Sequence, residues 1–323
     1  MLLPGSAAVS GNAPSDAITS IWRSCNQISS YPRFSLNPQD SIFLADKFRV
    51  LRSTLLSITD LIQNSLIFSS LIVIFQMPKK VMKSPGAVYS EWDALAETRF
   101  HQITSGDDLT FNHVLAPCLI EIAKSCKPQL IIDAGCGVGV LCDMLADMNV
   151  DLVGVDPSWE SIALAKKHFG GSGTFVCDTL EGFAKDNAGV TDLVLSNMVI
   201  MDVTDLKSFV AGIARVLKPG GRFVFSMGHP CFWPHYADFA KQDWYNYSEE
   251  QMVETPFRIS RGTQPEVPYT HIHRPLALYT KTLKQAGLVL EQLIEPLPTP
   301  EIEARYPKKW DYPRFLIMEW RKI

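Results

Sequence analysis

The chain has 323 residues, of which 46% are hydrophobic and 20% are charged, and its formal net charge is −4 with a pI of about 6.0. This length allows one large domain or two small ones, and the composition argues against a disordered chain and against a polyanionic partner. The seven cysteines are scattered without a CxxC pair. Their pattern argues against a disulfide framework or a metal site and favours reduced thiols in a cytoplasmic protein.

The N-terminal part of the chain differs from the rest, because residues 1–82 show no repeating strand and helix pattern. The apolar stretch at 65–77 is shorter than the roughly 20 residues that cross a bilayer, and it lies too deep for a signal peptide. We expect residues 1–82 to be a poorly structured or dispensable extension, with a packed extension or a segment absent from the working protein as alternatives, and residues 83–323 to form the folded domain. No stable membrane span is expected, although a weak association with a membrane through residues 61–77 stays open.

Regular patterning begins near Val88. Apolar residues at helical spacing predict a helix over 89–103 and another over 109–125, which ends before Lys127–Pro128 because the residue before a proline disfavours helical backbone. Short apolar strands then alternate with helical segments, and the strands are expected at 130–134, 151–156, 174–178, 192–197 and 221–227. A last helix and two further strand candidates, at 288–296 and 314–322, close the chain.

These strands are hydrophobic along almost their whole length, as strands must be in a parallel sheet covered by helices on both faces. The predicted fold class is therefore α/β, a Rossmann-like doubly wound sheet. A turn at LKPGG (217–221) should precede the fifth strand, and the long excursion at 229–275 is expected to lack regular structure.

The sequence LIIDAGCGVGVLCDML (130–145) places three glycines directly after the first strand and before a helix. Glycine permits positive φ and leaves no side chain to block a ligand that lies against the main chain. The helix that follows should point free N–H groups and its positive dipole end at the same place. We interpret the stretch as a ligand loop at the carboxyl end of a strand, in preference to a merely structural turn.

The type of ligand is not decided by this loop alone. The dinucleotide fingerprint GxGxxG requires glycine where Val140 stands, and the spacing present is DxGxGxG. Asp156, which closes the second strand, suits the two hydroxyls of a ribose, but nicotinamide enzymes also carry an acid there. Asp178 at the end of the third strand is placed to reach an adenine amino group beside Leu180 and Phe183.

The segments IIDAGCGVG, VGVDPS, FVCDTLEGF, DLVLSNMVIMDV and RVLKPGGRFVFSMGHPCF occur in this order. Together they resemble the motifs of class I S-adenosylmethionine-dependent methyltransferases, over about residues 88 to 323, and the HPCF after the fifth strand is similar to a small-molecule subgroup. The resemblance implies a seven-stranded sheet with the last strand antiparallel and S-adenosyl-L-methionine as cofactor. It implies that the glycine loop holds the methionine part, Asp156 the ribose, Asp178 and Thr179 the adenine, and Asn197 and Met198 the sulfonium side. The cofactor-binding residues expected on this basis are Asp133, Gly135, Cys136, Gly137, Asp156, Pro157, Asp178, Thr179, Asn197 and Met198.

Catalysis by such an enzyme rests mainly on positioning, and a base is needed only for some acceptors. His229 follows the fifth strand at the carboxyl edge of the sheet and is a candidate base, or else a turn contact before Pro230. His273 is a second candidate base. Arg274 could bind an acceptor carboxylate or pair with Glu266 or Glu295.

Aromatic residues supply the expected acceptor wall. The excursion contains Phe232, Trp233 and Tyr236, which could form a lid with a stacking or cation-binding surface. Tyr89 and Trp92 precede the sheet on a helix that caps the cofactor in this fold. Arg99 on the same helix could meet the methionine carboxylate, or it could lie on a solvated face.

The function expected from the sequence is metal-independent methyl transfer to the oxygen, nitrogen or carbon of a small organic acceptor. Nucleic acid is a poor acceptor candidate, because the chain is mildly acidic and the fourth strand reads SNMV, not the Pro-Pro motif used on exocyclic base nitrogens. No oligomeric state is indicated. A nicotinamide-dependent oxidoreductase and a non-catalytic binding module are the alternatives.

Overall fold

The computed structural model describes residues 77–260 and 267–323, which belong to one compact unit. The predictions for residues 1–76, including all but the last residue of the apolar stretch at 65–77, lie outside the described residues. Within the two described ranges, no helix is long and apolar enough to cross a membrane.

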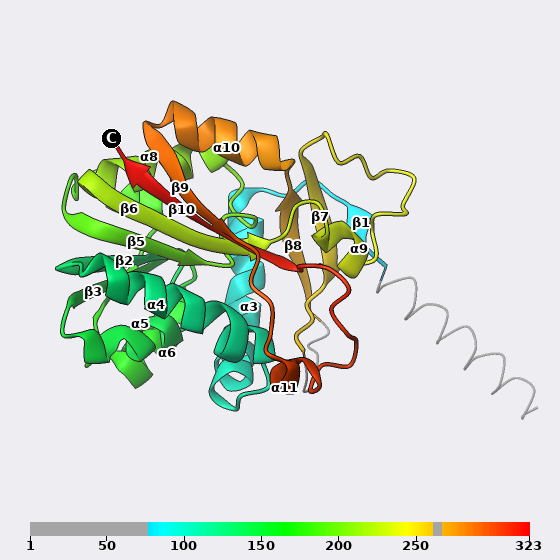
Figure 1. Ribbon diagram of the computed structural model, residues 1–323, viewed down its shortest axis with the longest axis horizontal. Coiled ribbons are helices and arrows are strands. Elements are labelled where there is room, and N and C mark those ends of the chain that lie inside the picture. The colour runs from blue at the N-terminus through cyan, green and yellow to red at the C-terminus, as the bar shows by residue number, and fades with distance from the viewer. Residues whose placement is uncertain (1–76, 261–266) are drawn as a thin grey trace, which may run out of the picture. The chain divides into compact units, whose positions relative to one another are not determined.

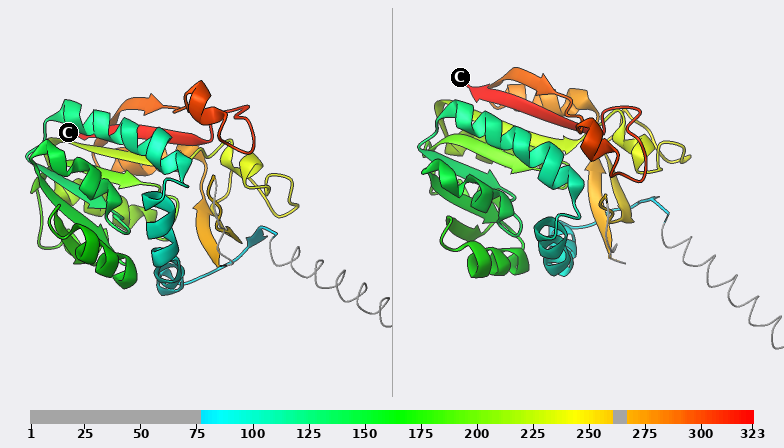
Figure 2. Two further views of the ribbon diagram at one scale, coloured as in Figure 1. Left: turned by 90° about the horizontal axis from the view of Figure 1, so that it is seen from below. Right: turned by 60° about the horizontal axis from the view of Figure 1, so that its bottom comes forward.

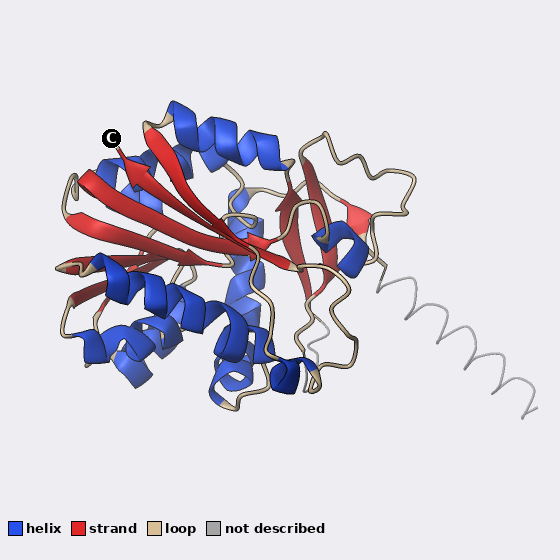
Figure 3. Cartoon of the chain, viewed as in Figure 1, coloured by secondary structure: helices blue, strands red, loops and turns tan. Residues whose placement is uncertain are grey.

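A seven-stranded sheet forms the centre of the unit, in the order β4-β3-β2-β5-β6-β10-β9 (Figures 1 and 3). β2 to β6 are paired in parallel, and β10 is antiparallel to both of its neighbours. This confirms the predicted α/β class and the antiparallel last strand. The strands of this sheet are β2 (Leu130–Ala134), β3 (Asp151–Asp156), β4 (Thr174–Cys177), β5 (Thr191–Asn197), β6 (Leu217–Gly228), β9 (Leu288–Ile294) and β10 (Phe315–Lys322).

Helices cover both faces of this sheet (Figures 1 and 2). Successive residues of β2 alternate between two cores: Ile132 packs in a cluster with residues of α8 and α10, and Ile131 packs in a cluster with residues of α4 and α5. Both residues are fully buried, which explains why the strands are hydrophobic without a polar face. The helices are α3 (Pro85–Thr104), α4 (Ala116–Cys126), α5 (Val140–Leu145), α6 (Trp159–Phe169), α7 (Leu180–Phe183), α8 (Leu206–Val216), α9 (Trp233–Tyr236), α10 (Leu276–Gln285) and α11 (Pro300–Glu303).

Local sequence fixes the ends of the first two predicted helices. α3 begins after Ser84, whose side chain accepts a hydrogen bond from the N–H of Ala87, and Pro85 occupies the first turn. α4 follows directly from a π-helical segment at Phe111–Leu115 and ends before Lys127, which adopts a left-handed φ of 48° ahead of Pro128.

A second sheet of three strands, in the order β1-β7-β8, comes from the excursion and from the residues before α3. Its strands are β1 (Lys79–Lys80), β7 (Gln251–Pro256) and β8 (Pro268–His273). The prediction that the excursion lacks regular structure is therefore wrong. Lys79 and Lys80 pair with Glu254 and Val253, so the folded region begins before residue 83, where its start was predicted. The LKPGG segment lies inside β6, which begins at Leu217. The pairing with β5 passes from Thr191–Leu217 to Leu193–Arg222, and Gly220 has a φ of +78°, so the predicted turn is present as an irregularity within the strand and not before it.

Candidate active site

A cavity of about 690 Å³ lies at the carboxyl ends of the parallel strands and is bounded by α3 and by residues of β7 and β8. Open α/β sheets bind their ligands at this edge. Most of the residues predicted for cofactor and acceptor line it. They are Tyr89, Trp92, Arg99, Asp133, Gly135, Cys136, Gly137, Asp156, Pro157, Thr179, Asn197, Met198, Trp233 and Tyr236.

The glycines of the loop after β2 serve different purposes. Gly135 has a φ of +80°, and a Cβ there would lie 2.4 Å from Cγ2 of Val199, so its lack of a side chain serves close packing. Gly139 is similarly crowded by Ala165 and Phe175. At Gly137 a Cβ would meet nothing within 4 Å, and the residue lines the cavity. Gly137 is therefore the position where the main chain is left bare toward a ligand.

The N–H groups of this loop are largely used inside the protein. Gly135 and Cys136 donate to the carbonyl of Val155 at 2.7 and 3.2 Å, and Gly139 donates to the carbonyl of Cys136 at 3.0 Å. α5 has only six residues. These N–H groups of the loop before α5 are therefore engaged within the protein, and nearby side chains add polar groups to the site.

Asp156 is fixed by two backbone donors. Its Oδ2 accepts the N–H of Gly137 and its Oδ1 accepts the N–H of Ser158, each at 2.8 Å. Burial raises the pKa of the Asp156 carboxyl to about 6, while these two hydrogen bonds act in the opposite direction. Each carboxylate oxygen keeps a further lone pair for a hydroxyl donor.

Asp133 is the penultimate residue of β2 and is 2% exposed. Its Oδ2 accepts a weak hydrogen bond from the thiol of Cys142 at 3.7 Å, and its Oδ1 has no partner among the described residues. Burial raises the pKa of Asp133 to about 7, the Cys142 bond lowers it and the charge of Asp156 raises it further. A buried oxygen without a partner on a cavity wall is suited to a ligand that brings a donor or a cation.

The end of β5 brings Asn197 and Met198 to the cavity. Met198 has a positive φ of 60°, which is rare for a residue with a side chain and is typical of strained positions at functional sites. The hydroxyl of Ser226 donates to Oδ1 of Asn197 at 2.5 Å, and the N–H of Met198 donates to the carbonyl of Ser226 at 3.1 Å. β6 therefore holds both residues in place.

Thr179 lines the cavity at the start of α7, but Asp178 does not. Asp178 is exposed, and its Oδ1 accepts the N–H of Thr179 at 2.7 Å. The cavity wall here consists of Thr179, Leu180 and Glu181.

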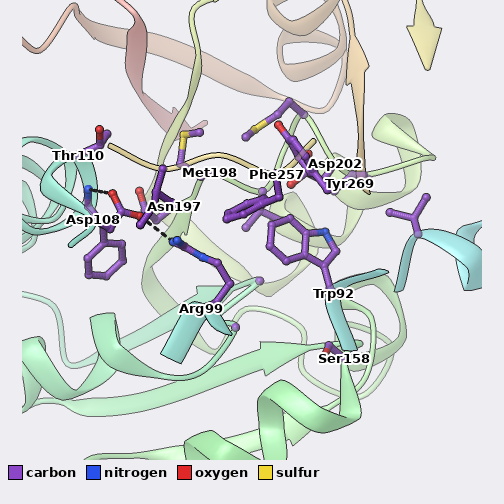
Figure 4. Close-up of a pocket in the computed structure, with 18 of the residues that line it drawn as sticks. Trp92, Arg99, Asp108, Thr110, Ser158, Asn197, Met198, Asp202, Phe257 and Tyr269 are labelled. Carbon is purple, nitrogen blue, oxygen red and sulfur yellow. Dashed lines mark hydrogen bonds and ion pairs between the residues drawn. The ribbon is translucent and has the colours of Figure 1, made fainter. Parts of the chain in front are cut away.

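Arg99 reaches the cavity from α3 with a side chain that is 16% exposed, so it does not lie on a solvated face. Its guanidinium forms an ion pair with Asp108 at 3.0 Å, donates to Oε1 of Gln102 at 2.9 Å and lies 5.1 Å from the ring centroid of Phe257. Figure 4 shows the pair of Arg99 and Asp108 on the wall beside Phe257. Its charge is compensated within the protein.

His229 does not belong to the cavity wall, and neither does Phe232. Nδ1 of His229 accepts the N–H of Cys231 at 3.2 Å, so the proton of the neutral ring lies on Nε2, which faces Oε1 of Glu295 at 3.0 Å. Burial lowers the pKa of His229, and the hydrogen bond to Glu295 raises it. Both ring nitrogens are engaged, and Phe232 packs on the ring at 4.6 Å between centroids.

His273 and Arg274 also lie outside this cavity. Nε2 of His273 is 3.0 Å from the carbonyl of Tyr247. Arg274 is 1% exposed and donates to Oε2 of Glu250 at 2.8 Å. The predicted partners of Arg274 are thus corrected, since Glu250 takes that place; Glu295 faces His229, and Glu266 lies outside the described residues.

Trp233 and Tyr236, which were predicted for the acceptor wall, both line the cavity. The ring of Tyr236 is already covered by a cation of the protein, Arg314. The guanidinium carbon of Arg314 lies 4.4 Å from the ring centroid of Tyr236 and 4.7 Å from that of Trp310. Arg314 also donates to the carbonyls of Lys308 and Lys309. The rings of Tyr236 and Trp310 therefore pack against the guanidinium of Arg314, which has a structural role.

Three lining residues that the sequence did not single out are Asp202, Phe257 and Tyr269. Asp202 follows the end of β5 within the apolar run VIMDV, and an acid in such a run is the signal that could have found it. Phe257 and Tyr269 come from the end of β7 and from β8. They would have been found only by recognising those two strands.

The residues present fit an adenosyl sulfonium ligand: the main chain is bare at Gly137, and Asp133 and Asp156 lie on the same wall. In the part of the chain that the structure describes, no group of three His, Cys, Asp or Glu side chains is arranged to hold a metal ion.

Residues 132–225 match a family model described as a methyltransferase domain. A ubiquinone biosynthesis O-methyltransferase of Aliivibrio fischeri (strain MJ11) is 31% identical over 153 residues, which cover 46% of this chain and 62% of that protein. The protein of the same description from Bradyrhizobium sp. (strain ORS 278) is 40% identical over 99 residues, 30% of this chain and 38% of its own length. The chain thus spans less than two thirds of the length of these curated relatives.

Among solved structures, a putative S-adenosylmethionine-dependent methyltransferase from Listeria monocytogenes shares 25% identity, with a TM-score of 0.47 over 60% of this chain and 91% of that one. A 1,6-didemethyltoxoflavin-N1-methyltransferase of Burkholderia thailandensis, with bound 1,6-didemethyltoxoflavin and S-adenosylhomocysteine, shares 17% identity, with a TM-score of 0.48 over 76% of this chain and 95% of that one.

Proposed function

We propose that the protein is an S-adenosylmethionine-dependent methyltransferase that acts on a small organic acceptor, since residues 132–225 match a methyltransferase-domain model and lie in a seven-stranded α/β sheet. The observation that carries the proposal is the bare main chain at Gly137 beside the carboxylates of Asp133 and Asp156 on one cavity wall. The names of the curated relatives support a small organic acceptor.

The proposal assigns each polar group of the wall a part of the methyl donor. Asp156 accepts the ribose hydroxyls, and the unpartnered Oδ1 of Asp133 accepts the ammonium group of the methionine part. Thr179 borders the adenine, and Asn197 and Met198 border the sulfonium. The bound donor supplies a methyl group on a positively charged sulfur, which is an activated leaving group.

The protein itself contributes mainly orientation. β6 holds the end of β5 through Ser226, and α3 covers the site with Tyr89 and Trp92, which limits the access of water. We include a cytoplasmic location in the proposal, supported by the scattered cysteines, which are free thiols wherever they are described.

Calorimetric titration with S-adenosylmethionine and S-adenosylhomocysteine tests the first half of the proposal, and the absence of binding by both would end it. Incubation with a donor labelled in its methyl group and a metabolite extract tests the second half. We expect a labelled small molecule in the extract, identified by mass spectrometry.

A further inference from the structure

Asp202 is a buried carboxylate on the cavity wall that the proposed donor site does not use. It is 8% exposed, it lines the cavity, and its Oδ1 has no hydrogen-bond partner among the described residues. A buried carboxylate oxygen without a partner is costly unless a ligand completes it. Asp202 is therefore suited to bind a ligand group that donates a hydrogen bond to Oδ1.

The cation whose charge acts on Asp202, Arg274, is already engaged. Arg274 donates to Glu250 at 2.8 Å and to the carbonyls of Ile200 and Val203 at 3.3 and 2.7 Å. Its charge still acts on Asp202 through space and lowers the pKa of that carboxyl against the larger effect of burial. Within the described ranges, no Lys, Arg or His forms an ion pair with Asp202.

The other charges nearby are balanced among themselves. Glu91, whose charge raises the pKa of Asp202, pairs with Lys83 and accepts the N–H of Thr270 at 2.8 Å. Lys83 also pairs with Glu254, which Lys79 approaches at 2.6 Å. The two lysines thus balance the charges of the two glutamates, and neither lysine compensates the negative charge of ionised Asp202.

Three aromatic rings line the same cavity as this carboxylate. Trp92, Phe257 and Tyr269 contact one another edge to face, with ring centroids 5.9, 5.9 and 5.3 Å apart, and all three line the cavity. We name them the aromatic wall. Figure 4 shows Asp202 and Tyr269 on one side of Phe257 and Arg99 on the other, and the charge of Asp202 raises the pKa of Tyr269.

The other described cations on the cavity wall are not paired with Asp202 and do not compensate its charge. Arg314 lies against aromatic rings and donates to backbone carbonyls, while Arg258 and Lys308 are exposed to solvent. Exposed charges are screened by water, whereas a buried carboxylate beside aromatic faces attracts an organic cation strongly.

We propose that the methyl acceptor is a basic amine, held as an ammonium ion by Asp202 and the aromatic wall. This inference rests on the proposed function, because it names the acceptor class of the same cavity. An ammonium group supplies the donor that Oδ1 lacks and the positive charge that the neighbourhood lacks, and its apolar substituent packs on the rings.

The same carboxylate serves the reaction. One N–H proton of the ammonium passes to Asp202, which frees the lone pair on nitrogen. A nitrogen–carbon bond then forms as the carbon–sulfur bond of the donor breaks, and its electron pair stays on sulfur. The products are a methylammonium ion, the neutral thioether and a protonated Asp202, which releases its proton to solvent. Burial raises the pKa of Asp202 and so makes it a better proton acceptor.

The test compares two probes that differ in the charged nitrogen, phenethylamine and 2-phenylethanol. Each is titrated by calorimetry near neutral pH into protein saturated with S-adenosylhomocysteine. The wild-type protein is expected to bind the amine about tenfold more tightly than the alcohol, and Asp202→Asn is expected to remove this preference. Phe257→Leu should weaken the amine more than the alcohol, because it keeps an apolar side chain but removes a ring.

The control is Asp186→Asn, which removes an exposed carboxylate that does not line the cavity and should leave both affinities within about twofold. Affinity for S-adenosylhomocysteine in every variant reports folding and the donor site separately. If that ligand binds but the wild type does not prefer the amine, or if Asp202→Asn keeps the preference, the amine assignment is overturned. If that ligand does not bind the wild type, the proposed function itself fails.

Discussion

The N–H of Gly137 donates to Oδ2 of Asp156 at 2.8 Å, and this bond ties the loop after β2 to the end of β3. The shape of the loop and the orientation of the carboxylate are therefore set together. The second oxygen is held by the N–H of Ser158 in the same way, so the carboxylate has one defined position on the cavity wall.

Substitution of Gly137 separates ligand access from folding. Gly137→Ala places a Cβ in open space on the cavity wall at a φ of +52°, so it should greatly weaken donor binding while the left-handed backbone costs only about 1–2 kcal/mol of stability. Gly137→Val should act more strongly on both. Calorimetry measures donor affinity, and thermal unfolding measures stability.

Gly135→Ala is the matched control, because its Cβ would clash with Val199 and should mainly lower stability. Unchanged donor affinity in Gly137→Ala would show that the ligand lies elsewhere.

Replacement of Asp156 tests the ribose contact. Asp156→Asn leaves one oxygen to accept a backbone N–H and removes the charge, and Asp156→Ala removes both acceptors. We expect donor affinity to fall by about 1–3 kcal/mol, the range for a lost hydrogen bond to a charged group. Calorimetry with S-adenosylhomocysteine gives the value. Wild-type affinity in both variants would remove Asp156 from the proposed donor site.

Stability of the ligand-free protein should depend on pH through Asp133 and Asp156. Their pKa values are raised in the folded state, to about 7 and about 6, so the native state binds more protons than the unfolded state between about pH 4 and pH 7. Stability is therefore expected to fall as pH rises through this window, by up to about 1.4 kcal/mol per pH unit for each group, and to level off above it.

Denaturant unfolding across this pH range measures the effect, with Asp133→Asn as the comparison. The amide does not titrate, so this variant should lose the part of the slope that belongs to Asp133. Donor binding should change in the opposite sense, because ionised Asp133 attracts an ammonium group. An identical slope in the variant and the wild type would contradict the assignment.

His229 is expected to be a structural residue. Its ring nitrogens face Cys231 and Glu295, and it does not line the cavity. His229→Gln should lower stability by about 1 kcal/mol through the lost hydrogen bonds and change turnover by less than about threefold. Steady-state kinetics with the identified acceptor decide the point. A large fall in turnover at constant donor affinity would instead indicate a base.

The central sheet could be predicted because each of its strands carries its own signal. β2, β3 and β5 are short apolar runs with a polar residue at or next to their last position, and in the structure those ends meet at one edge, where Asp133, Asp156 and Asn197 share the cavity. The second sheet could not be predicted in this way. Lys79 pairs with Glu254, which is distant in the sequence, and the local sequence of a two-residue strand does not predict such a pairing.

On the proposed acceptor side, the sequence could not predict which single polar residues face the cavity. Arg274 and His229 are polar residues near the expected edge, but their partners Glu250 and Glu295 decide that they face the protein and not the cavity. An acid within an apolar run marks position 202, but that signal does not distinguish a site residue from a structural one. Its importance depends on burial and on the missing partner, which are properties of the folded chain.

The short strand β1 has a consequence for the N-terminal boundary of the folded unit. A polypeptide that began at Met82 would keep the loop around Gly137 but would lack the outer strand that pairs with β7, along with Lys79 beside Glu254. One that began at Met77 would keep both. Loss of residues 77–81 is therefore expected to leave the loop around Gly137 unchanged and to remove support from β7, which carries Thr255 and Pro256 of the cavity wall.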